Sequence, residues 1–174
     1  RLQLLQPGHR VLDLGCWPGS WTLYAAEQIG PTGRVMGMDL KPVDIALPAN
    51  AKTVVQDAFH FNGLRMPKMD VVLSDMAPTT TGDFVSDHSR SAQFVELAMS
   101  IADSKLVTGG ALLAKMFDGS ETKGLLKQFR IRYETGRLMR PKATRSQSNE
   151  IFLVGLGKKS TNVQLPATWS APAP

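Results

Sequence analysis

Short apolar runs alternate along the chain with longer segments in which apolar residues recur every three or four positions. This pattern predicts buried strands in the short runs and amphipathic helices in the longer segments. The seven expected strands cover residues 10–14, 35–38, 53–55, 71–74, 111–116, 133–139 and 151–156. The expected helices run from the turn after the first strand to about residue 29, over 88–106 and over 121–130, and Gly109-Gly110 is expected to end the second helix and start the fifth strand.

Alternating strands and helices predict an α/β fold with an open, mostly parallel seven-stranded sheet and helices on both faces. The last two strands follow one another without a helix, so we expect the sheet to finish with an antiparallel strand. A chain of 174 residues suits one domain. We expect that domain over residues 1–157 and a disordered, polar and proline-rich tail over 158–174. No apolar run is long enough for a membrane helix.

Charge is distributed unevenly along the chain, whose net charge is +5. Residues 1–120 hold 10 basic and 12 acidic residues, whereas residues 121–174 hold 10 basic and 3 acidic ones. A basic last third indicates a polyanionic partner such as a nucleic acid, although a solvated surface with a basic tail explains the same counts.

The single cysteine, Cys16, cannot form an internal disulfide, which favours a reducing compartment. We therefore expect a cytoplasmic protein, with the mitochondrial matrix as the alternative. The chain starts at Arg1 without a methionine or a signal-like segment, and we expect it to be a trimmed product.

Polar residues and glycines follow the first three predicted strands. The first strand leads into Gly15-Cys-Trp-Pro-Gly19, where glycine permits a close backbone approach to a ligand. This spacing differs from the Gly-x-Gly-x-x-Gly of dinucleotide-binding proteins, which disfavours a nicotinamide dehydrogenase. Asp39 and Asp57 end the second and third strands, where carboxylates bind ribose hydroxyls in nucleotide-binding sheets. Each of them alone is better explained as a turn or cap residue, but together with the glycine turn they predict a nucleoside-type ligand.

Three ionisable residues follow the later strands. Asp75 opens Asp-Met-Ala-Pro78, Lys115 ends an apolar strand, and Glu150 begins the last one. A lysine among apolar neighbours is suited to proton transfer, but each of the three is also explained as a solvated charge at a strand end. His9, His60 and His88 form no zinc-type spacing with Cys16, so no metal site is expected.

Several strings resemble one family when they are taken in order: Val11-Leu-Asp-Leu-Gly15-Cys-Trp-Pro-Gly19-Ser-Trp21, Asp39-Leu, Ser74-Asp-Met-Ala-Pro78, Lys115-Met-Phe and Ser148-Asn-Glu150-Ile-Phe152. The chain resembles the FtsJ-type ribosomal RNA ribose 2′-O-methyltransferases over about residues 4–157. The resemblance implies a class I methyltransferase (Rossmann-like) fold, S-adenosyl-L-methionine as cofactor, and transfer of its methyl group to a 2′-hydroxyl of RNA.

Site residues are implied by the same resemblance. Cofactor contacts fall on Gly15, Gly19, Trp21, Asp39, Asp57 and Asp75. Asp75, Lys115 and Glu150 match the last three members of the family's Lys-Asp-Lys-Glu catalytic tetrad. The first lysine lies in that family upstream of the string matched here by Leu4-Leu-Gln-Pro7-Gly8, and we expect it before Arg1. The chain departs from the family at Cys16-Trp17, where small residues are common.

The acceptor implied by the resemblance is a uridine in large-subunit ribosomal RNA, and tRNA and an mRNA cap are alternatives. A non-catalytic RNA-binding protein of methyltransferase ancestry is the remaining alternative. We expect a monomer. RNA is expected to lie over basic residues near the last loop, with weaker contributions from His88 and Arg90. The basic residues are Arg137, Arg140, Lys142 and Arg145.

Overall fold

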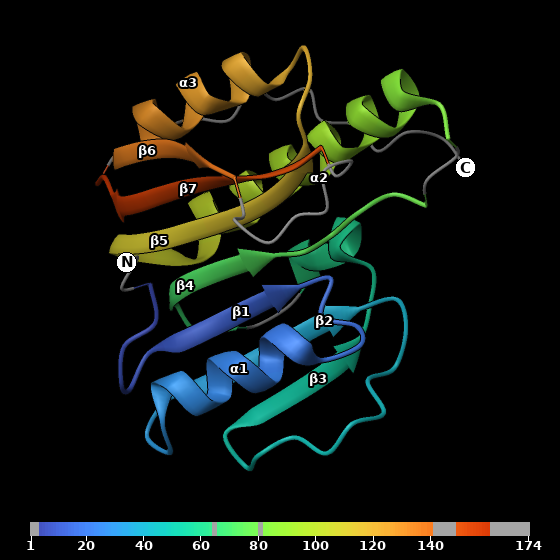
Figure 1. Ribbon diagram of the computed structural model, residues 1–174. Coiled ribbons are helices and arrows are strands. Elements are labelled where there is room, and N and C mark those ends of the chain that lie inside the picture. The colour runs from blue at the N-terminus through green and yellow to red at the C-terminus, as the bar shows by residue number, and fades with distance from the viewer. Residues whose placement is uncertain (1–3, 64–65, 80–81, 141–148, 161–174) are drawn as a thin grey trace.

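The computed structural model describes residues 4–63, 66–79, 82–140 and 149–160 (Figure 1). The strands are β1 (Arg10–Leu14), β2 (Arg34–Asp39), β3 (Ala51–Val55), β4 (Met69–Ser74), β5 (Leu106–Phe117), β6 (Tyr133–Met139) and β7 (Glu150–Lys158). The helices are α1 (Ser20–Ile29), α2 (Phe84–Lys105) and α3 (Thr122–Arg132), with a 3₁₀ segment, η1 (Ala58–Gly63), after β3.

The strands form one seven-stranded sheet in the order β3-β2-β1-β4-β5-β7-β6. The first five strands in this order are parallel, and β7 is antiparallel to both of its neighbours. The predicted fold class is therefore confirmed. The carboxyl ends of β1 to β5 share one edge of the sheet, which is where ligands bind in open α/β folds.

Helices cover both faces of the sheet, as predicted. Helix α1 lies on one face, and α2 and α3 lie on the other (Figure 1). Alternate side chains of β1 point to opposite faces of the sheet. Val11 therefore packs among the apolar residues between the sheet and α1, whereas Leu12 packs among those between the sheet and α2. Sandwiching the sheet between two apolar layers fixes the strand register that aligns the strand ends.

The boundary between α2 and β5 differs from the prediction. Gly109-Gly110 was expected to end the helix and start the strand, but α2 ends at Lys105 and β5 begins at Leu106. The two glycines lie inside β5, where Gly109 has a φ of 83° and the register with β4 shifts. A Cβ on Gly110 would lie 2.9 Å from the Val107 carbonyl oxygen, so glycine is needed for a bulge rather than for a helix stop.

The last strand ends at Lys158, one residue beyond the predicted end of the domain. Most of the expected disordered tail, from residue 161 on, lies outside the described residues. Within the part of the chain that the structure describes, no helix is both long enough and apolar enough to cross a membrane.

Helix α3 is anchored to the sheet by Phe129, which is fully buried and stacks on Tyr133 with ring centroids 5.6 Å apart. Phe129→Ala is expected to lower the free energy of unfolding by about 3–5 kcal/mol, because it leaves a cavity in the core. Chemical denaturation measures the change. Ile131→Ala in the same helix is the control, since Ile131 is 47% exposed. Equal losses for the two variants would contradict this packing.

Candidate active site

A cavity of about 520 Å³ opens at the carboxyl ends of the parallel strands. Its volume lies within the range of small-molecule sites. Five of the predicted site residues line it, namely Gly15, Asp39, Asp57, Asp75 and Lys115. They come from the ends of β1 to β5 in that order, so the structure brings together residues that lie up to 100 positions apart.

The turn after β1 is held against the end of β2. The backbone N–H groups of Gly15 and Cys16 both donate to the Met38 carbonyl oxygen, at 2.8 and 3.2 Å. Gly15 has a φ of 74°, and a Cβ there would lie 2.7 Å from the Met76 nitrogen. Only glycine fits this position, because a side chain would collide with Met76 in the loop that follows β4.

Asp39, the last residue of β2, stabilises the same turn through hydrogen bonds to its carboxylate. One carboxylate oxygen accepts from the Trp17 nitrogen at 2.9 Å, and the other accepts from the Lys41 nitrogen at 2.9 Å. The Lys41 ammonium lies 4.5 Å from the centre of the Trp17 ring. Asp57, after β3, is oriented in a similar way by the Phe59 nitrogen, also at 2.9 Å.

The lining of this part of the cavity fits a nucleoside-bearing cofactor. Asp39 and Asp57 supply carboxylates that can accept from ribose or base donors, and the Gly15 backbone lines the cavity beside them. Between them lie apolar walls suited to a purine ring, formed by Met38, Leu40, Ala58, Phe59 and Phe94. The residues present therefore fit S-adenosylmethionine, whose adenosine end needs both kinds of surface.

Two predicted cofactor contacts are not among the residues that line the cavity. Gly19 precedes α1 with a φ of 113°, and a Cβ there would lie 2.8 Å from the Ile45 side chain. Trp21 packs on Phe152 of β7, with ring centroids 5.8 Å apart. The contact of these two residues with a cofactor remains a prediction.

Asp75, Lys115 and Glu150 form one charged cluster. The Lys115 ammonium donates to Asp75 Oδ1 at 2.6 Å and lies 3.7 Å from Glu150 Oε1. Only 14% of the Lys115 side chain is exposed, against 30% for Asp75 and 36% for Glu150. Burial raises the pKa of Asp75, and the Lys115 partner opposes that rise. The cluster is thus partly withdrawn from water beside the cavity.

Backbone pairing explains how Glu150 reaches the cluster. Antiparallel pairing of β7 with β5 puts Glu150 opposite Phe117 and Phe152 opposite Lys115. On the other side, the Asp75 nitrogen donates to the Leu14 carbonyl oxygen at 2.9 Å, which fixes the start of the loop after β4. Three strands therefore hold the three side chains.

The predicted RNA contacts are only partly described. Arg137 and Arg140 are exposed at the outer strand β6, and Arg140 forms an ion pair with Asp118. The hydrogen bond from Arg140 lowers the pKa of Asp118. Lys142 and Arg145 lie outside the described residues.

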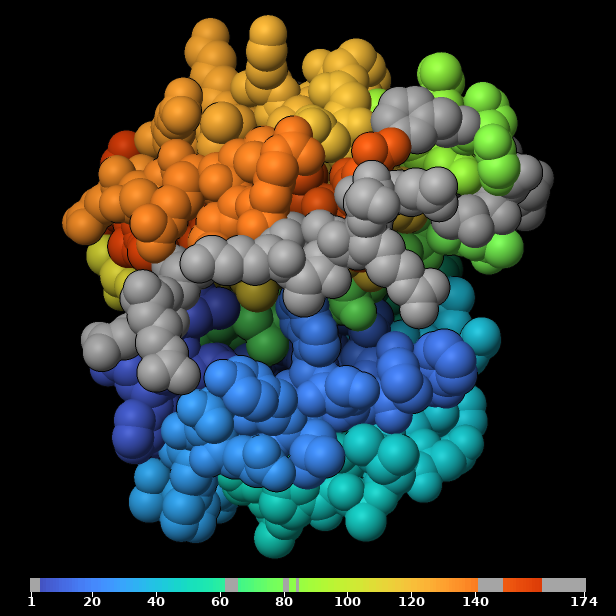
Figure 2. Space-filling view, in the orientation of Figure 1, coloured from blue at the N-terminus to red at the C-terminus, as the bar shows by residue number. Residues whose placement is uncertain are grey.

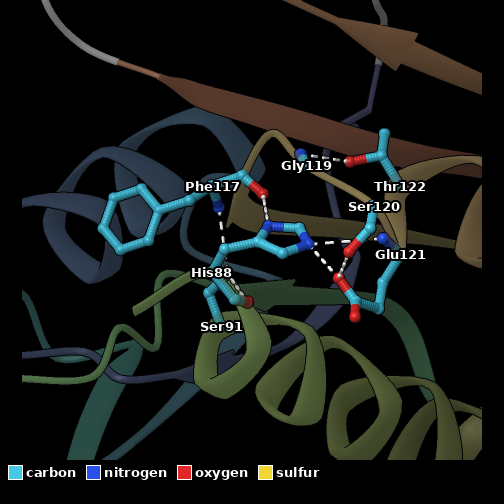
Figure 3. A network of polar contacts seen from close by, with 7 residues as sticks. All are labelled: His88, Ser91, Phe117, Gly119, Ser120, Glu121 and Thr122. Atoms are coloured by element: carbon cyan, nitrogen blue, oxygen red, sulfur yellow. Dashed lines mark hydrogen bonds and ion pairs between the residues drawn. The ribbon is translucent and has the colours of Figure 1, made fainter. Parts of the chain in front are cut away.

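His88 does not face solvent, because it is 3% exposed and braces the turn after β5 (Figure 3). Its Nδ1 donates to the Phe117 carbonyl oxygen at 2.8 Å, and its Nε2 lies against the Glu121 carboxylate. Ser91 adds a second tie, since its hydroxyl accepts from the Phe117 nitrogen at 3.1 Å. The strand end that carries Lys115 is therefore fixed to α2. Arg90, the other weaker RNA candidate, pairs with Asp87 at 2.6 Å.

Asp13 was not predicted as a site residue, although an acidic residue between two leucines in a strand is unusual. It is fully buried, and its Oδ2 accepts from the Thr22 hydroxyl at 2.6 Å. Its Oδ1 has no hydrogen-bond partner among the described residues. Burial raises the pKa of Asp13 to about 7, and the nearby charges of Asp75 and Asp39 add to the effect.

Comparisons with known proteins agree with this geometry. The family of FtsJ-like methyltransferases matches residues 1–158. The chain is 43% identical over 163 residues to a protein of Desulforapulum autotrophicum named ribosomal RNA large subunit methyltransferase E, a match covering 91% of this chain and 80% of that protein.

Solved structures share the fold. A ribosomal RNA methyltransferase from Plasmodium falciparum, so described, superposes with a TM-score of 0.73 at 24% identity, over 88% of each chain. Fibrillarin of Aeropyrum pernix, solved with bound S-adenosyl-L-methionine, gives a TM-score of 0.63 at 17% identity over 88% of this chain and 68% of that one.

The raised pKa of Asp13 predicts a pH-dependent stability. Between about pH 4 and pH 7 the unfolded chain has lost this proton while the folded chain keeps it, so stability falls as pH rises through that window. Asp13→Asn removes this dependence. Its stability relative to the unmodified chain is expected to rise by on the order of 2 to 3 kcal/mol between pH 5 and pH 7. Urea denaturation at both pH values measures it, and an unchanged difference would contradict the assignment.

Proposed function

Because the chain belongs to the FtsJ-like methyltransferase family, we propose that it transfers the methyl group of S-adenosylmethionine to a ribose 2′-hydroxyl of RNA. The observation that carries the proposal is the Asp75–Lys115–Glu150 cluster beside a cavity that fits the cofactor. The substrate class follows from the relative named for the large-subunit ribosomal RNA, and we expect a uridine as the acceptor.

The order of the strands orients the cofactor. Asp39 ends β2 and Asp57 follows β3, whereas Asp75 follows β4 and Lys115 lies in β5, on the other side of β1. We therefore assign the adenosine to the β2–β3 side of the cavity and the reacting end to the Asp75–Lys115 side. S-adenosylmethionine supplies there a methyl group activated by its bond to a positively charged sulfur.

Lys115 is the residue that we assign to removing the proton of the acceptor 2′-hydroxyl. The 2′-oxygen forms a bond to the methyl carbon as the carbon–sulfur bond breaks, and the hydroxyl proton must leave. A lysine can accept it only as the neutral amine, which forms when Lys115 passes a proton to Asp75 Oδ1, 2.6 Å away. The raised pKa of Asp75 favours that transfer, because burial makes its carboxylate a better proton acceptor.

Positioning supplies much of the remaining acceleration. A methyl transfer of this kind needs the oxygen, carbon and sulfur in line, and holding two reactants in place lowers the barrier by several kcal/mol. Glu150 Oε1 lies 3.7 Å from the Lys115 ammonium as its second carboxylate partner, and we assign Glu150 to holding the ribose.

Exposed Arg137 lies on β6 and exposed Arg140 directly follows it, next to the strand that begins with Glu150, and both support an RNA partner. Phosphate contacts of this kind position the RNA without reading its sequence.

An RNA substrate and a lone, buried cysteine also support a cytoplasmic place of action, and we propose that the chain acts there as a monomer.

Lys115→Met tests the catalytic assignment. The rate of methyl transfer to large-subunit ribosomal RNA is expected to fall about 10²–10⁴-fold, because the variant cannot move the proton. The dissociation constants for RNA and for S-adenosylhomocysteine should stay unchanged. Rates come from a labelled cofactor and affinities from calorimetry.

Lys52→Met is the matched control, since Lys52 is exposed on β3 and does not line the cavity. Methyl transfer by Lys115→Met at a near-normal rate would overturn the role of Lys115. RNA binding without any transfer by the unmodified chain would instead indicate a non-catalytic RNA-binding protein.

Asp39→Asn tests the cofactor side of the cavity. An amide cannot accept both N–H groups that Asp39 holds, nor offer a charge to a ribose, so the dissociation constant for S-adenosylhomocysteine should rise about tenfold or more. At saturating cofactor the transfer rate should stay near normal. Asp44→Asn is the control, because Asp44 is exposed and does not line the cavity. Equal calorimetric affinities for the two variants would remove Asp39 from the cofactor site.

A further inference from the structure

Helix α3 carries four basic residues and no acidic residue between Thr122 and Arg132. Arg132 is buried against Asp103, with Nε 2.9 Å from the carboxylate, and serves the packing of the helix. The other three are exposed: Lys123, Lys127 and Arg130. Their spacing of four and then three residues places them on one face of the helix. We call these three side chains the α3 basic face.

Two residues of the α3 basic face, Lys123 and Lys127, lower the stability of their own helix, whereas Arg130 stands in the last turn, where the helix dipole favours a cation. Like charges four or three residues apart repel one another, and Lys123 stands in the first turn, where the helix dipole disfavours a cation. None of the three side chains forms an ion pair with any residue that the structure describes. Local choices that oppose stability without compensation are typical of functional surfaces.

Gly124 adds a further local cost on the exposed side of α3. Glycine weakens a helix interior, and a Cβ at this position would meet nothing within 4 Å, so alanine would fit without strain. A glycine that packing does not require leaves the helix backbone open to close approach by a partner between Lys123 and Lys127.

The concentration of cations is particular to α3. Among the described residues, α1 exposes one charged side chain, Glu27, and α2 exposes Glu96. The two basic residues of α2, Arg90 and Lys105, are half-buried. A general need for solubility does not explain why one helix presents only cations while the others present acids.

The α3 basic face adjoins the proposed RNA surface. Helix α3 begins five residues after Phe117, the last residue of the strand that carries Lys115. It packs beside β6, and Arg130 Nε donates to the Gly136 carbonyl oxygen at 3.3 Å, directly before Arg137. Helix α3 forms the upper edge of the molecule in Figure 1, and its side chains stand out from that edge in Figure 2.

We propose that the α3 basic face is a second docking surface, which binds the phosphates of RNA that flanks the acceptor nucleotide. This inference rests on the proposed function. Lys123 and Arg130 are seven residues apart, about 10 Å along the helix. One strand of a nucleic acid double helix carries about three phosphates over such a length. The face should therefore contribute affinity for long RNA without taking part in the chemical step.

The double variant Lys123→Gln/Lys127→Gln tests the proposal. The slope of log affinity against log salt concentration for large-subunit ribosomal RNA is expected to become shallower by about 1.5, since each lost phosphate contact removes roughly 0.7–0.9. The KM for this RNA should rise, while kcat at saturating RNA should stay unchanged. The melting temperature should be unchanged or higher, because a like-charge pair is removed.

Arg10→Gln/Lys52→Gln is the matched control, which removes two exposed cations from the other end and edge of the sheet. It should leave the salt slope and the KM unchanged. An unaltered slope in the α3 variant, or an equal change in the control, would overturn the docking surface. Either result leaves the proposed function intact, whereas absence of methyl transfer by the unmodified chain is the separate outcome that refutes it.

Discussion

The antiparallel pairing of β7 with both β5 and β6 is the constraint on which the site depends. This pairing places the start of β7 beside the end of β5, and so brings Glu150 within 3.7 Å of the Lys115 ammonium. It also sets β6, with Arg137, at the outer edge of the sheet. One strand thereby joins the charged cluster, the cavity and the basic surface. Parallel strands alone would leave Lys115 with a single carboxylate partner, Asp75.

The loops at the carboxyl edge are tied to their neighbours rather than left free. The Leu14 and Met38 carbonyl oxygens hold the turns after β4 and β1, and the Asn149 carbonyl oxygen accepts from the Asp118 nitrogen at 2.8 Å. His88 of α2 adds a hydrogen bond to the Phe117 carbonyl oxygen at the end of β5. Such ties hold Asp75 and Lys115 in place before any ligand binds, and this preorganisation is what a reaction limited by alignment requires.

Residues at strand ends were predictable because the apolar pattern locates each buried strand, and parallel strands end at one edge. Asp39, Asp57, Asp75 and Lys115 line one cavity for this reason. The apolar pattern carries no information on strand order, so the position of β7 between β5 and β6 could not be derived from it. Gly109-Gly110 was misinterpreted because a bulge and a helix stop both use glycine. The partners of Asp13 likewise depend on packing rather than on neighbours in the sequence.

We propose that the Asp75–Lys115–Glu150 cluster methylates a ribose oxygen of large-subunit ribosomal RNA. Its most direct test is the position of a transferred methyl group. The chain is incubated with unmethylated large-subunit ribosomal RNA and methyl-labelled S-adenosylmethionine, and the RNA is then digested and analysed by mass spectrometry. Label is expected in one 2′-O-methylated nucleotide, whose 3′ phosphodiester resists alkaline cleavage because the 2′-hydroxyl is blocked. Label on a base, or cofactor binding without any labelled RNA, would contradict it.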